Sequence, residues 1–236
     1  MLAREAKLPM DFEALARVRL REGAGGGASG DGFCVMELVS WISGDDHVTD
    51  QPDCTSPHLT AFAIALNDSA LTGRIRDLMK PLAFLIVGTR DARAERRRAD
   101  YLRRQCARVL LAPLLGAAGL RAQANRLRSA VKRRDILAAA REAESALSNV
   151  TRSHASANAR AAAAHLAEAC GTRETAQALR DCAYCTLTAP ADLETKLALW
   201  RKAHAIVRVA IDLGKHADIA AASEAAPERA AMQVAG

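Results

Sequence analysis

The sequence predicts an all-α fold, a single-domain bundle of about seven to nine helices. Three observations lead to this prediction. The 236-residue chain contains 53 alanines, whereas Phe, Trp and Tyr together make up 3% of it. Alanine loses little entropy in a helix, so such a composition favours helices that pack through small side chains. Apolar residues also recur at helical spacing along most of the chain, and alternating strand-like segments are nearly absent.

The first predicted helices are marked by capping residues. An apolar stripe begins at Val35 and stops before Gly44, a residue suited to the left-handed turn after a helix. The next helix begins at the pair Ser56 and Pro57, an N-cap followed by a first-turn proline. Asp68 or Ser69 is expected to cap the third helix.

Prolines and glycines divide the following segments. Pro81 is expected to kink or restart the third helix, and Gly88 to end it. A long helix is predicted over about 90–112, where Pro113 and the glycines at 116 and 119 break it.

The second half is predicted to be helical throughout. Further helices are expected over 120–131, 136–150, 154–170 and 172–186, with Asp135 as a cap. The last begins after Pro190 and Asp192 and is expected to end at Gly214. Only 16–22 and 83–88 resemble strands.

The predicted organisation is an N-terminal arm and linker (1–32), one helical domain (33–214) and a loose tail (215–236). The run GAGGGASGDG at 23–32 has the composition of a flexible linker. The start of the chain lacks the apolar core of a secretory signal, and no apolar run is long enough for a membrane span. Six cysteines without a signal peptide indicate reduced thiols and a cytoplasmic protein.

The stretch from Cys34 to Asp68 is rich in potential metal ligands. Cys34 and Glu37 share a helix face, Asp50 lies in the following loop, and Cys54 and His58 flank a helix start. These five groups are candidate ligands for zinc. Alternatively, Cys54 with His47 or His58 would form a nucleophile and its base. The spacing matches no specific metal signature, so capping and core roles are the favoured interpretation, with no cofactor expected.

The same stretch carries a family resemblance. The segments CVMELVSWISG, DQPDCTSP, AFAIALND, KP and LIVGT, within residues 33–90, resemble a family of uncharacterised proteins from actinobacteria and their phages. An Ala-rich helical second half, here 136–214, is similar too. The resemblance implies kinship, and the positions that match are Cys34, Glu37, Asp50, Cys54, Asn67 and Asp68. Two histidines typical of the family are replaced here by the Gly-rich run and by Gln51, which argues against an intact metal or acid–base site.

Two short patterns elsewhere carry weaker signals. Gly25, Gly27 and Gly30 match the spacing of a dinucleotide-binding loop, but no β-α-β unit surrounds them, so a linker is favoured. Cys182 and Cys185 form a single C-x2-C pair on a predicted helix, for which core packing is favoured over metal or redox use.

Basic residues are concentrated in two adjacent helical segments. Residues 90–104 contain seven arginines and three acids, and residues 121–134 contain six lysines or arginines and no acid. If the two helices lie antiparallel, they share a surface that attracts phosphate groups. The residues expected to bind such a partner are Arg93, Arg96, Arg97, Arg98, Arg103, Arg104, Arg126, Arg128, Lys132, Arg133 and Arg134. With few aromatic residues for base stacking, a duplex or structured RNA is favoured over a single strand.

Three functions remain open from the sequence. The favoured one is a non-catalytic helical binding protein that engages nucleic acid or a host protein complex, for instance a phage or prophage accessory factor that inhibits a host defence complex. The second is a metal- or thiol-dependent enzyme that uses Cys34, Glu37, Asp50 and Cys54. The third is a structural protein that forms homo-oligomers through its Ala-rich helices. No catalytic constellation with recognisable spacing is present, and this favours the first function.

Overall fold

The structure is a computed structural model that describes residues 17–24, 32–150, 153–171 and 175–234, with residues 215–234 as backbone alone. Its helices are α2 (Val35–Ser43), α3 (Pro57–Ser69), α4 (Gly73–Asp77), α5 (Lys80–Ile86), α6 (Ala92–Gln105), the π-helix η1 (Cys106–Leu111), α7 (Ala112–Ala117), α8 (Arg121–Ser129), α9 (Arg133–Ser148), α10 (His154–Gly171), α11 (Thr175–Thr188) and α12 (Leu193–Val234). The described residues contain no strand, only an isolated bridge between Leu20 and Phe33. The predicted all-α fold is therefore confirmed.

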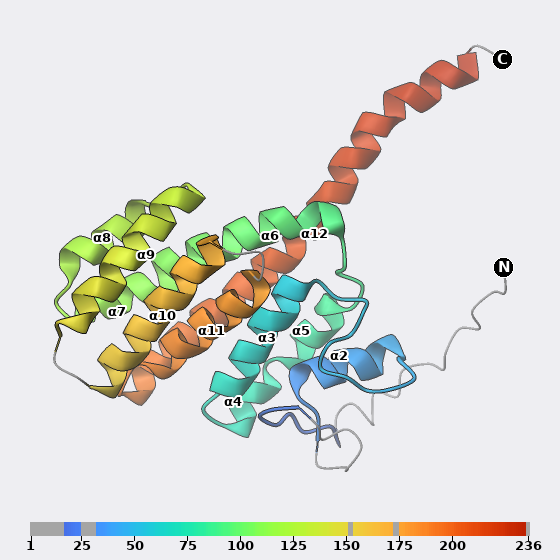
Figure 1. Cartoon of the computed structure of the whole chain (residues 1–236). Coiled ribbons are helices and arrows are strands. Elements are labelled where there is room, and N and C mark those ends of the chain that lie inside the picture. The colour runs from blue at the N-terminus through green and yellow to red at the C-terminus, as the bar shows by residue number, and fades with distance from the viewer. Residues whose placement is uncertain (1–16, 25–31, 151–152, 172–174, 235–236) are drawn as a thin grey trace.

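Four helices form a row, and α6 and α12 pack across that row (Figure 1). Helices α9, α10, α11 and α3 pack side by side in that order. Helix α12 packs on α6 and on α3, and α6 also contacts α3 and α9. Helix α2 packs against α5 and α3 near the N-terminal part of the bundle. Helix α6 thus lies in contact with α3, α9 and α12.

Local capping chemistry fixes the start of α2 and α3. Cys34 caps α2, since its sulfur accepts the Glu37 N–H while the Glu37 carboxylate accepts the Cys34 N–H at 2.7 Å. Gly44 ends α2 with a φ of 74°, a conformation that glycine adopts without strain. Ser56 caps α3 and Pro57 occupies its first turn. These two caps match the sequence-based predictions.

Two predicted caps lie elsewhere in the structure. Helix α3 continues through Asp68 and Ser69, and Thr72 caps α4 by accepting the Ile75 N–H at 3.3 Å. Asp135 lies in the first turn of α9, which begins at Arg133. In both cases a neighbouring residue has the extended backbone that a cap requires, and the sequence alone did not distinguish between adjacent polar residues.

The long helix predicted over 90–112 extends further, because Pro113 does not break it. Helices α6, η1 and α7 follow one another without interruption over 92–117. Pro113 lies in the first turn of α7, directly after the π-helical segment. A proline in a first turn leaves no helical hydrogen bond unmade, so the change of register at η1 lets the chain stay helical.

Gly214 is not the end of the last helix. Helix α12 runs through it to Val234, and the part beyond Gly214 projects from the bundle in Figure 1. The predicted loose tail therefore has a helical backbone up to Val234. A Cβ atom at Gly214 would clash with Nη2 of the buried Arg98. Glycine is needed at this position for close packing rather than for a turn.

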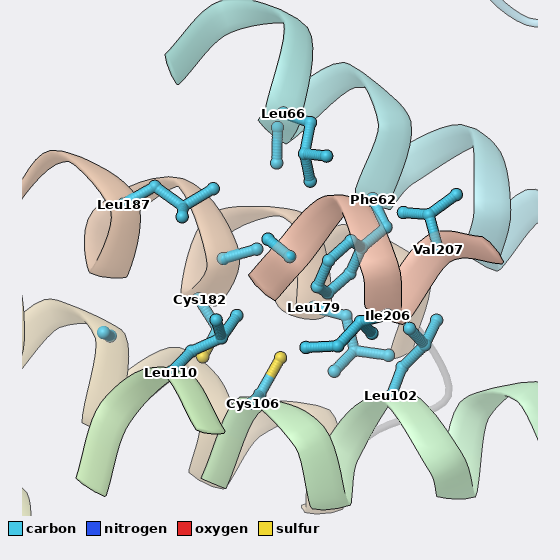
Figure 2. Packing of buried hydrophobic residues seen from close by; sticks show 14 of the residues in the cluster. Phe62, Leu66, Leu102, Cys106, Leu110, Leu179, Cys182, Leu187, Ile206 and Val207 are labelled. Carbon is cyan, nitrogen blue, oxygen red and sulfur yellow. The ribbon is translucent and has the colours of Figure 1, made fainter. Parts of the chain in front are cut away.

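The core lies between α3, the α6–η1 segment, α11 and α12 (Figure 2). Its fully buried side chains include Phe62 and Leu66 of α3, Leu102 of α6, Leu179 of α11 and Val207 of α12. Elsewhere in the bundle, where α9 packs on α10, many of the buried residues are alanines. This core packs α3, α6 and α11 against one another.

Candidate nucleic-acid interface

The cysteine and glutamate proposed as metal ligands have structural roles. Both Cys34 and Glu37 are buried, and their functional groups are used in the cap of α2. Burial raises the pKa of the Cys34 thiol to about 12, and the neighbouring Glu37 carboxylate acts in the same direction. The thiol is therefore protonated at neutral pH, a state that makes it a poor nucleophile.

The other candidate ligands are not joined to this pair. His58 bonds to Glu95 of α6 instead, with 2.6 Å between Nδ1 and Oε2. Cys54 is half-buried in the loop before α3 and Asp50 is half-buried in the same loop. Within the part of the chain that the structure describes, no group of three or more Cys, His, Asp or Glu side chains is placed to hold a metal ion.

Arg98, one of the predicted partner-binding residues, faces the interior. Its side chain is the largest of those that are fully buried, with 1% exposure for the residue. Its guanidinium donates to the carbonyls of Thr89 (2.7 Å) and Ala210 (3.2 Å) and to the Glu95 carboxylate (2.9 Å). The assignment of Arg98 to a binding surface is therefore wrong, since this side chain joins α6 to α12.

Arg103 and Arg133 both bond to the end of α10. Arg103 is 6% exposed, and its Nε donates to the Ala169 carbonyl at 2.7 Å, while Arg133 Nε donates to the Cys170 carbonyl. Cationic side chains are favourable at a helix C-terminus, where carbonyls lack partners. Burial lowers the pKa of Arg103, and the nearby Arg133 cation lowers it further, although Asp100 opposes both. Arg103 is predicted to contact a partner directly, but in the structure its side chain instead joins α6 to the end of α10.

The remaining basic residues separate into a cluster and scattered positions. Arg96 and Arg104 of α6 lie with Lys132 and Arg133, at the start of α9, around one cavity of about 620 Å³. We call this cavity the basic pocket. Its wall is completed by His58, Glu95, Ala99, Asp100, Arg103, Val131, Ile136 and Thr175.

The other predicted binding residues lie outside the basic pocket. Arg93 and Arg97 are exposed on the outer face of α6, and Arg134 is exposed beside Asp135. On α8, Arg126 pairs with Glu142 and Arg128 donates to Asn125 at 3.0 Å. Residues 90–104 and 121–134 are predicted to lie side by side. In the structure α6 lies near the start of α9, whereas α8 packs on η1, α7 and α9.

A network of three hydrogen bonds orients His58 at the edge of the basic pocket. The Glu95 carboxylate accepts from Ser56 Oγ (2.8 Å), His58 Nδ1 (2.6 Å) and Arg98 Nη1 (2.9 Å). Burial alone raises the pKa of Glu95, but the bonds from His58, Ser56 and Arg98 outweigh it and hold the pKa below its usual value. An ionised carboxylate only accepts, so Nδ1 of His58 carries the proton.

Sequence reasoning missed Glu95 as a site residue. His58 was singled out for its nearness to Cys54, but its partner is 37 positions away in the chain. A signal was present, because Glu95 is one of only three acids in the Arg-rich stretch 90–104. The sequence did not reveal which of those three acids faces α3.

The C-x2-C pair of α11 does not form a paired site. Cys182 is fully buried and its thiol partner is Cys106 of η1 (Figure 2). Cys185 is half-buried. Bonding to Cys106, together with burial, raises the pKa of Cys182. All six cysteines of the chain are free thiols in the structure. The glycines of the dinucleotide-like pattern, Gly25, Gly27 and Gly30, lie outside the described residues.

Comparisons with protein-family models, curated proteins and solved structures find no match for this chain. The resemblance to actinobacterial and phage proteins therefore stays a prediction. Among the described residues, no helix has both the length and the apolar character needed to cross a lipid bilayer.

Proposed function

We propose that the protein binds the phosphate groups of duplex or structured nucleic acid at the basic pocket, as a non-catalytic binding protein. The observation that carries this proposal is the convergence of cations from two helices on one cavity. Arg96, Arg104 and Lys132 have no carboxylate partner among the described residues, and Arg133 bonds only to a carbonyl. A phosphate group would supply the missing counter-charge.

The acids of the basic pocket support the same interpretation. Glu95 is bonded to Arg98 and His58, and Asp100 is paired with Arg103 at 2.7 Å. Both carboxylates are thus neutralised by groups other than the exposed cations. The local excess of positive charge exceeds what the net charge of +6 for the whole chain suggests. Such an excess in a concave site focuses the electric field and raises the local concentration of anions.

The composition of the basic pocket favours backbone contacts over base reading. Its lining contains no Phe, Trp or Tyr on which a base could stack. The exposed arginines Arg93 and Arg97, on the same helix as Arg96, extend the positive surface beyond the pocket. Contacts of this kind bind phosphates irrespective of sequence. We expect the partner to be recognised by its charge and shape.

The test compares two triple variants that lower the net charge equally. In the pocket variant, Arg96, Arg104 and Lys132 are changed to Gln. In the control variant, the exposed Arg141, Arg160 and Arg208, which lie away from the basic pocket, are changed to Gln. Fluorescence anisotropy with a stem-loop RNA and a DNA duplex should show that the pocket variant loses affinity at least about 30-fold, whereas the control loses less than about threefold. Equal losses would show that net charge, not the pocket, causes binding.

A further inference from the structure

We propose that the basic pocket recognises a terminal phosphate monoester of the nucleic acid, with His58 as the residue that selects it over an internal phosphodiester. This inference rests on the proposed function, because it names which phosphate of the partner enters the pocket. It follows from the position of the His58 ring, from the hydrogen-bonding state of that ring and from the density of positive charge around it.

The ring lies between two cavities. His58 lines the basic pocket and also a second cavity of about 370 Å³, which Gln51, Ala176 and Arg180 help to form. The side chain is 15% exposed, and Glu95 holds Nδ1 at 2.6 Å. With Nδ1 engaged, Nε2 is the ring atom that remains for a ligand. Glu95 of α6 contacts the ring, and Arg96 of α6 and Arg180 of α11 line the two cavities that His58 separates.

The fixed proton on Nδ1 decides what Nε2 can bind. In the neutral ring Nε2 is an acceptor, because the single proton lies on Nδ1 beside the Glu95 carboxylate. An internal phosphodiester offers only acceptor oxygens. It therefore forms no hydrogen bond with Nε2, which is also an acceptor. A phosphate monoester has a second pKa of about 6, so a minor fraction of it, the monoanion, still carries an exchangeable proton at neutral pH. It therefore satisfies Nε2 without a proton from solvent.

The proton balance of the complex is simple. The P–O–H proton of the monoester moves to, or is shared with, Nε2 of His58, which gives an imidazolium beside a phosphate dianion. The Nδ1 proton stays on its bond to Glu95. The complex gains a charge-assisted hydrogen bond, which is stronger than a bond between neutral groups. A diester forms this bond only by taking up a proton from the solvent.

The charge of the basic pocket fits a dianion. Arg96, Arg104, Lys132 and Arg133 line one cavity of about 620 Å³, a size typical of small-ligand sites. One internal phosphodiester brings a single negative charge, whereas a terminal monoester brings up to two. The positive charge is concentrated around a compact cavity and is not spread along a groove. This arrangement favours a terminal phosphate over the internal phosphates of a nucleic acid.

The experiment measures the binding of one stem-loop RNA with three kinds of end: both ends hydroxyl, a 5′-phosphate, or a 3′-phosphate. For the full-length protein near neutral pH, we expect one of the two phosphorylated forms to bind at least about tenfold more tightly than the hydroxyl form. That preference should disappear in His58→Gln and persist in His165→Gln, since His165 is on α10 away from the basic pocket.

A second measurement uses the unaltered protein and avoids the risk that His58→Gln disturbs folding. Inorganic phosphate and sulfate compete with the phosphorylated RNA at equal ionic strength. Phosphate should displace the RNA at a lower concentration than sulfate, although sulfate carries more negative charge, because only phosphate brings a transferable proton. Equal affinity of all three RNA forms, or stronger competition by sulfate, would overturn this inference but leave the proposed function intact. Absence of binding by every RNA form would overturn both.

Discussion

At the scale of single residues, Arg98 shows how a charged side chain in an Arg-rich segment becomes part of the core. Its guanidinium is held by two carbonyls and by Glu95, and it leaves no space for a Cβ atom at Gly214. These contacts join α6 to α12 and keep Glu95 in place. The orientation of His58 therefore depends on a residue that does not touch the basic pocket.

The packing of Gly214 on Arg98 predicts an unusual response to alanine. Alanine normally stabilises a helix relative to glycine by about 1 kcal/mol. We expect Gly214→Ala to destabilise the protein by about 1–3 kcal/mol instead, because the added methyl group displaces a buried guanidinium. Gly171→Ala is the matched control, since nothing lies within 4 Å of a Cβ atom there. Urea denaturation measures both, and equal stability of the two variants would contradict this packing.

The Glu95 network predicts how stability depends on pH. The pKa of Glu95 is lowered in the folded protein, so its contribution is fully present at neutral pH and is lost as the pH falls through the folded-state pKa. Glu95→Gln should therefore cost about 2 kcal/mol at pH 7. The difference between the two proteins should shrink below about pH 4, the ordinary range of a glutamate. Denaturation curves at several pH values test this, and a constant difference would show that charge is not involved.

Residues whose roles depend on near neighbours in the chain were predictable. The caps at Ser56 and Gly44 follow from local backbone chemistry, and the structure has both. The bonds of His58 to Glu95 and of Arg98 to Ala210 span 37 and 112 positions. Nothing in the local pattern specifies such pairs, because they depend on how the helices pack. For this reason the sequence pointed to the basic segments but not to the residues that form the basic pocket.

At the scale of helices, small side chains set the spacing of the bundle. Helices α9, α10 and α11 pack in sequence, and Ala159, Ala162 and Ala163 of α10 are buried at these contacts. The Ala-rich composition predicted helices, and this prediction was correct. The composition does not predict which faces meet, because alanines occur on all sides of α10.

Close packing at α10 predicts that a larger side chain will not be tolerated there. Ala163→Leu should destabilise the protein by about 1–3 kcal/mol, because the added atoms push neighbouring helices apart. Ala157→Leu makes the same change at an exposed position of the same helix and should have little effect. Thermal unfolding followed by circular dichroism compares the two, and similar melting temperatures would contradict close packing along this face of α10.

At the scale of the whole molecule, the basic pocket is a product of the fold. Its cations come from α6 and from the start of α9, its histidine from α3, and Arg103 and Arg133 are held there by the end of α10. The sequence predicted a basic surface shared by residues 90–104 and 121–134. In the structure, the cations that gather around one cavity come from α6 and the start of α9 and not from α8, because α8 packs on η1, α7 and α9.

The most direct test of the proposed interface is the salt dependence of binding to a nucleic-acid duplex. Changing Arg96, Arg104 and Lys132 to Gln should make the slope of log affinity against log salt concentration less negative, by about 0.9 for each phosphate that these cations neutralise. The variant with Arg141, Arg160 and Arg208 changed to Gln has the same net charge and should keep the slope of the unaltered protein. An unchanged slope in the pocket variant, or the same change in both variants, would contradict binding at the basic pocket.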